Sequence, residues 1–208
     1  MNINPLPPCY KLTLPSSDFV EKREIASQIA SLLVKSIPPP IGKPDNNVDW
    51  TRSVRRELGT LLSGSEFLEK NWLCFPTDPN TPKGEFLVDL VWWRAREGAA
   101  LVVESEWLPK LHAILTDFDK ICVIKSPFKL MIYNTVPTGP TSAEVKEKFQ
   151  EHLSEYKQHI EGETYIFLEF MPNERAQAFI WQAKLSEATQ PAVLEMLLPV
   201  TQVIRRLA

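Results

Sequence analysis

The stretch ALVVESEWLPK, residues 100–110, decides the fold class of this chain. Its first four residues are apolar and begin a buried strand, and the apolar character then stops at Glu104 and Glu106, which Ser105 separates. Side chains alternate between the two faces of a strand, so both carboxylates are predicted to point to the same side and Ser105 to the other.

The preceding segment supplies a third carboxylate, Asp89. Residues 85–94 are rich in β-branched and aromatic side chains, and a short turn separates them from a second strand at 99–107. Equal counting from a pairing of residues 94 and 99 places Asp89 opposite Glu104. Directly opposite residues have β-carbons about 4.5–5.5 Å apart, so we expect the carboxylates to converge.

The remaining elements surround this predicted hairpin. Apolar periodicity predicts helices over 17–37, 48–62, 108–126, 141–162 and 190–207, and strands over 128–135, 163–171 and 176–183. The helix between strands 99–107 and 128–135 makes a right-handed crossover, which predicts that these two strands are parallel. The fold class is therefore α/β, with a mixed central sheet flanked by helices.

A Pro-rich segment follows the first helix and suggests two parts. Residues 1–47 hold an N-terminal helix and a linker, and residues 48–208 hold the α/β domain, and together they are expected to form one compact unit. Residues 63–84 contain three prolines and are predicted to be irregular.

Composition excludes several classes. The formal net charge is −3, so affinity for nucleic acid would have to come from a local basic face. No apolar run is long enough to cross a bilayer, so no membrane association is expected. The three cysteines are scattered and form no metal-ligand pattern, and we see no secretion signal, which favours a cytoplasmic setting. His152 and His159 are predicted to lie on the surface of helix 141–162, too far apart for one metal ion.

Three carboxylates on one patch of sheet repel one another and are costly to desolvate without a partner. A divalent cation relieves both costs. Mg²⁺ prefers hard oxygen ligands and is commonly held by one or two carboxylates beside a substrate phosphate. The pattern of Asp89, Glu104 and Glu106 therefore indicates a Mg²⁺ site, with Mn²⁺ as the alternative ion.

The sequence VDLVWW followed by ESE, with fourteen residues (90–103) between Asp89 and Glu104, resembles the active-site core of the PD-(D/E)xK nuclease superfamily. The resemblance covers roughly residues 48–135 and implies the restriction-endonuclease-like fold, a three-layer core. It further implies that Asp89 and Glu104 bind the metal, and that Glu57 on helix 48–62 is the acidic residue that members place near it.

The chain departs from the family pattern at two positions. Glu106 stands where most members carry a lysine, so the chain resembles the ExE variant, and Val88 replaces a common proline. Some members take the missing lysine from the following helix, which makes Lys120, or else Lys110, the candidate. The resemblance implies a Mg²⁺-dependent nuclease that hydrolyses DNA phosphodiester bonds, with Glu106 and Lys120 completing the catalytic group.

Four arginines are candidates for DNA contacts, namely Arg52, Arg55, Arg56 and Arg94. Each site residue also has a simpler interpretation. The glutamates can line a solvated edge strand, Asp89 can cap a turn or pair with Arg94, and the helical charges can face water. A catalytically inactive nuclease-like module that binds a protein or nucleic acid is thus the alternative function. Whether the protein is an enzyme, and whether two copies pair as a homodimer, stay open at this level.

Overall fold

A computed structural model describes residues 19–36, 47–63, 73–78, 80, 87–172, 175–183 and 197–203. Its elements in chain order are α1 (Phe19–Ser36), α2 (Asn47–Ser63), β1 (Leu73–Phe75), β2 (Leu90–Arg94), β3 (Gly98–Glu106), α3 (Leu111–Val123), β4 (Phe128–Asn134), α4 (Ser142–Glu155), β5 (Thr164–Met171), β6 (Arg175–Gln182) and β7 (Leu197–Val203).

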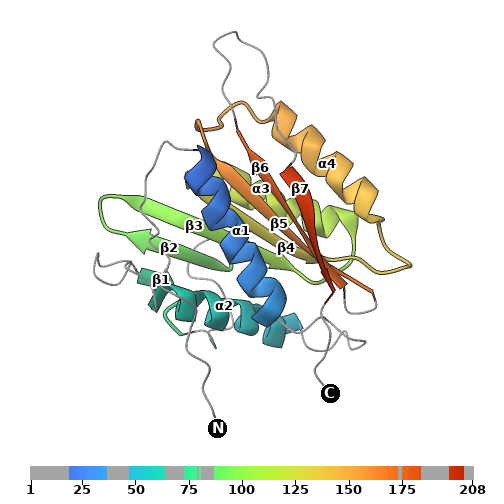
Figure 1. Cartoon of the computed structure of the whole chain (residues 1–208), viewed down its shortest axis with the longest axis horizontal. Helices are drawn as coiled ribbons and strands as arrows, with labels where there is room; N and C mark the ends of the chain where they lie inside the picture. Colours follow the sequence, from blue (N-terminus) through green and yellow to red (C-terminus); the bar gives the residue numbers. More distant parts are fainter. Residues whose placement is uncertain are drawn as a thin grey trace.

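The seven strands form one sheet in the order β1-β2-β3-β4-β5-β6-β7 (Figure 1). The β3–β4 and β4–β5 pairs are parallel and the other pairs are antiparallel. The mixed sheet, the β2–β3 hairpin and the parallel crossover through α3 were all predicted, and all are confirmed. Among the described residues, no helix is long and apolar enough to cross a membrane.

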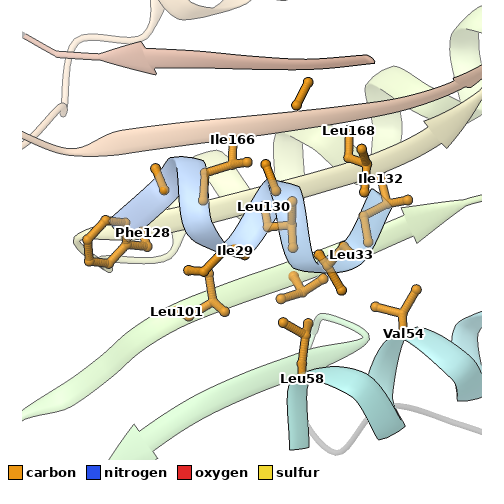
Figure 2. Packing of buried hydrophobic residues seen from close by; sticks show 14 of the residues in the cluster. Ile29, Leu33, Val54, Leu58, Leu101, Phe128, Leu130, Ile132, Ile166 and Leu168 are labelled. Carbon is orange, nitrogen blue, oxygen red and sulfur yellow. The ribbon is translucent and has the colours of Figure 1, made fainter. Parts of the chain in front are cut away.

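Helices cover both faces of the sheet. Buried side chains of α1 and α2 pack with one face of β2 to β6, and buried side chains of α3 and α4 pack with the other. Figure 2 shows Ile29 and Leu33 of α1 among Leu130 of β4, Ile166 of β5 and Leu58 of α2. Since α1 contributes to the same core as the strands, residues 19–36 fold onto the sheet and not apart from it.

Near its turn the β2–β3 hairpin differs from the predicted register by one residue, and a β-bulge restores that register farther along the strands. Arg94 pairs with Gly98 and not with residue 99, and the register shifts after Trp93 pairs with Ala99, which leaves Ala100 as the extra residue of a β-bulge. Leu90 then pairs with Val103. Asp89, the residue before β2, therefore arrives level with Glu104, as equal counting predicted.

The predicted helix over 190–207 is wrong for residues 197–203, which form strand β7 beside β6. Pro199 and three β-branched residues oppose a helix here, and an edge strand tolerates a proline. The rest of that predicted helix lies outside the described residues.

Two more predictions were wrong in extent. Residues 73–75 were expected to be irregular but form β1, which pairs with β2. Helix 141–162 was expected to reach Gly162, but α4 ends at Glu155. His159 consequently lies beyond the helix with a side chain only 3% exposed, where it contacts Glu163.

Candidate active site

Glu104 and Glu106 stand on the same face of β3, as predicted, and Lys120 and Asp117 of α3 lie beside them on that face. Ser105 faces the opposite side, where its hydroxyl lies 3.0 Å from Oγ1 of Thr51 on α2. Glu104 is 3% exposed, whereas Glu106, the last residue of the strand, is half-buried. The alternation of β3 therefore buries one carboxylate beneath α3 and leaves the second nearer to solvent.

The buried Glu104 carboxyl has an unusual charge environment. Burial raises its pKa to about 9, and the negative charges of Asp89 and Asp117 contribute to the rise. Lys120 Nζ on α3 lies 3.3 Å from Glu104 Oε1 and opposes this shift. Burial and the two acidic neighbours together outweigh Lys120, so the surroundings of Glu104 favour its protonated form.

Lys120 is held between two acidic side chains. Besides Glu104, it donates a hydrogen bond of 2.5 Å to Oδ1 of Asp117, one turn earlier on α3. Burial lowers the pKa of Lys120, but Asp117 and Glu104 outweigh it, so the pKa is raised. The ammonium is therefore charged at neutral pH. The sequence offered Lys120 and Lys110 as the lysine that comes from the following helix. The structure brings Lys120 to Glu104.

Glu106 turns back toward the chain that follows β3. Its Oε1 accepts a 2.6 Å hydrogen bond from the backbone N–H of Leu108. Burial raises the pKa of Glu106, and the nearby Asp117 carboxylate raises it further. Asp117 is therefore a neighbour of both glutamates and of the lysine.

Asp89 is fixed from two sides at the start of β2. Its Oδ2 accepts hydrogen bonds from the backbone N–H of Ser105 at 2.9 Å and from the Ser105 hydroxyl at 2.6 Å. Arg55 of α2 donates from Nη2 to Oδ1 at 3.3 Å and from Nε to the Asp89 carbonyl at 3.0 Å. The pairing with Arg94 that the sequence allowed is not the one observed.

Arg55 was predicted to contact DNA, yet it is only 4% exposed and its guanidinium holds Asp89. Its place is inside the molecule. The other candidates lie nearer the surface, each beside an acidic side chain. Arg52 pairs with Asp49 at 3.1 Å, Arg56 lies 3.5 Å from Glu57, and Arg94 pairs with Glu97 in the hairpin turn.

Carboxylate oxygens are the ligands that a hard divalent cation prefers, but the two carboxylates have different neighbours. Asp89 bonds to Ser105 and to Arg55 of α2, whereas Glu104 lies beside Lys120 of α3. Glu104 and Asp89 supply carboxylate oxygens, and a carboxylate has about four lone-pair sites, so Asp89 keeps acceptor capacity beyond its observed bonds. Two carboxylates suffice for Mg²⁺. Glu57, which the resemblance placed near the metal, contacts Arg56. In the part of the chain that the structure describes, no group of three or more His, Cys, Asp or Glu is placed to hold one ion.

Asp117 and the internal role of Arg55 were not foreseen from the sequence. Asp117 precedes Lys120 by three residues on a helix, a spacing that brings two side chains together, so this signal was available. The Arg55–Asp89 contact joins residues 34 positions apart, and no local pattern indicates it. Comparison of the chain with family models, curated proteins and solved structures gives no match.

Proposed function

We propose that this protein is a Mg²⁺-dependent nuclease that hydrolyses DNA phosphodiester bonds, built on a core of the restriction-endonuclease-like kind. The observation that supports it most is the approach of Lys120 to the buried Glu104 at 3.3 Å. A lysine from the helix after β3 thereby occupies the neighbourhood in which the ESE sequence lacks one. The order of hairpin, helix and parallel strand around the carboxylates also agrees with this proposal.

In this proposal Asp89 and Glu104 hold the cation, which when bound acidifies water and offsets charge on the phosphodiester. Lys120 keeps its proton, so it acts as a hydrogen-bond donor that orients the attacking water and stabilises a phosphate oxygen. Glu106 helps to orient the same water. Arg52, Arg56 and Arg94 are the remaining candidates for contacts to the DNA backbone, and such contacts would weaken with added salt.

The first prediction tests the two carboxylates with isosteric substitutions. Asp89→Asn and Glu104→Gln preserve side-chain volume. The single carbonyl oxygen of Asn can accept from Ser105 or from Arg55 but not from both, because its amide nitrogen only donates. We expect each to reduce Mg²⁺-dependent cleavage of plasmid DNA by at least about 100-fold. Substitution of a residue that only hydrogen-bonds to a metal ligand already lowers metal affinity or activity by about 10–100-fold. Glu155→Gln, at an exposed position on α4, is the control and should cleave normally. Full activity of both site variants, with unchanged circular dichroism, would rule the proposal out.

A second candidate is a catalytically inactive module that binds a protein or nucleic acid. The observation that favours it is internal neutralisation, since Arg55 already pairs with Asp89 and Lys120 with Glu104. Titration calorimetry with Mg²⁺ and with Mn²⁺ separates the two functions. Binding that Glu104→Gln removes supports the nuclease, whereas no binding to the unaltered protein supports the inactive module.

A further inference from the structure

Among the described residues, two acidic side chains act on Glu104, namely Asp89 and Asp117, and of these Asp117 comes from a helix. It lies on α3, its side chain is 15% exposed, and its Oδ1 is 2.5 Å from the ammonium of Lys120. Glu104 and Glu106 both come from β3, and the charge of Asp117 acts on each of them. Asp117 therefore connects the helix that carries the lysine to the strand that carries the glutamates.

A lysine side chain is flexible, and its ammonium reaches a defined position only where partners restrain it. Lys120 is 40% exposed, so packing alone leaves it considerable freedom. Its two anchors differ in length, with Asp117 at 2.5 Å and Glu104 at 3.3 Å. The shorter one does not involve a proposed metal ligand, so it stays available when Glu104 shares its oxygens with a cation.

We propose that Asp117 is a positioning residue that holds the Lys120 ammonium over the Glu104 carboxylate. This inference rests on the proposed function, since the position matters only if Lys120 orients water at the phosphodiester. Asp117 acts through Lys120 and makes no contact with substrate in this proposal.

The chain offers a matched control on the same helix. Asp119 is two residues along α3, and its carboxylate contacts Nδ1 of His152 on α4 at 2.8 Å. Asp119→Asn removes the same charge from the same helix without touching Lys120. An effect seen with Asp117→Asn and not with Asp119→Asn therefore comes from the immediate neighbours of Asp117, which are Lys120 and the two glutamates, and labelling of Lys120 itself separates the two.

The first experiment needs no cleavage activity. The rate at which acetic anhydride modifies Lys120 is measured by mass spectrometry against pH, in metal-free protein. Asp117→Asn removes an anionic partner, so the apparent pKa of Lys120 should fall, and each unit of the fall gives about tenfold more neutral amine at a fixed pH below it. Asp119→Asn should leave the profile unchanged. An unchanged profile in Asp117→Asn would overturn the positioning role.

The second experiment compares steady-state cleavage of DNA with Mg²⁺. Asp117→Asn should lower kcat by about tenfold or more and leave KM nearly unchanged, and Asp117→Glu, which keeps the charge, should recover part of kcat. Equal kcat for Asp117→Asn and the unaltered protein overturns the positioning role. Absence of cleavage by the unaltered protein instead refutes the proposed nuclease, while the labelling profile still decides whether Asp117 holds Lys120.

Discussion

The carboxyl of Glu104 has the largest pKa shift among the proposed site residues. Glu104 is 3% exposed, so burial disfavours its charged form, and the negative charges of Asp89 and Asp117 disfavour it further. The positive charge of Lys120 offsets only part of these two effects. The residue therefore binds its proton more tightly in the folded chain than in the unfolded chain, and folding in the absence of a cation takes up a proton.

This linkage predicts how stability depends on pH. The pKa of Glu104 is about 9 when folded and 4.5 when unfolded, so between these values the unfolded chain has already lost the proton that the folded chain keeps. This group's contribution to the free energy of unfolding should therefore be complete below pH 4.5 and fall as the pH rises toward 9. Urea unfolding of metal-free protein at several pH values measures the slope.

Glu104→Gln isolates this effect. The amide carries no charge, so the variant should be more stable than the unaltered protein at pH 8.5, by at least about 1 kcal/mol, roughly one pKa unit. The exposed Glu155→Gln is the control. A variant that loses stability at pH 8.5 would show that the charged carboxylate is already well compensated by Lys120.

At the scale of elements, a buried ion pair joins α3, β4 and β5 at the N-terminal ends of the two strands. Lys129 of β4 and Glu163 just before β5 are each 1% exposed and paired at 2.5 Å. The Lys129 ammonium also donates to the carbonyl of Cys122 at the end of α3 and to the hydroxyl of Tyr165. Here the connections between elements are polar and fully enclosed.

Lys129→Met should therefore destabilise the fold by about 3–5 kcal/mol, because it leaves the Glu163 carboxylate buried without its cation. The double variant Lys129→Met with Glu163→Gln should recover part of the loss, since it removes both charges. Chemical denaturation of the single and double variants gives the comparison. A loss below about 1 kcal/mol for the single variant would contradict this account of the network.

At the scale of the whole molecule, α1 packs across β5 and β6 and shares its core with α2. Leu33 is fully buried between this helix and the sheet (Figure 2). Leu33→Ala should cost about 2–5 kcal/mol by leaving a cavity. Unfolding followed by tryptophan fluorescence and by circular dichroism should keep a single, coincident transition. Two separate transitions would mean that α1 folds independently of the sheet.

The sequence by itself determined the layout of the central elements. Alternation in residues 99–107 put both glutamates on one face, and the apolar runs and intervening helix specified a hairpin and a parallel crossover. These are local patterns, set by strand and helix periodicity and by chain connectivity, so they can be predicted from the sequence alone. The candidates Asp89 and Glu104 came from this level, whereas Lys120 was a candidate only through the resemblance to the nuclease superfamily.

Only the tertiary structure decided which charges meet. The contact between Arg55 and Asp89, the burial of Glu104 beneath α3 and the ion pair of Lys129 with Glu163 all join separate segments. The strand at 197–203 likewise exists through its pairing with β6. Charge interactions depend on distance and on exclusion of water, and these are properties of the packed chain that no spacing along the sequence contains.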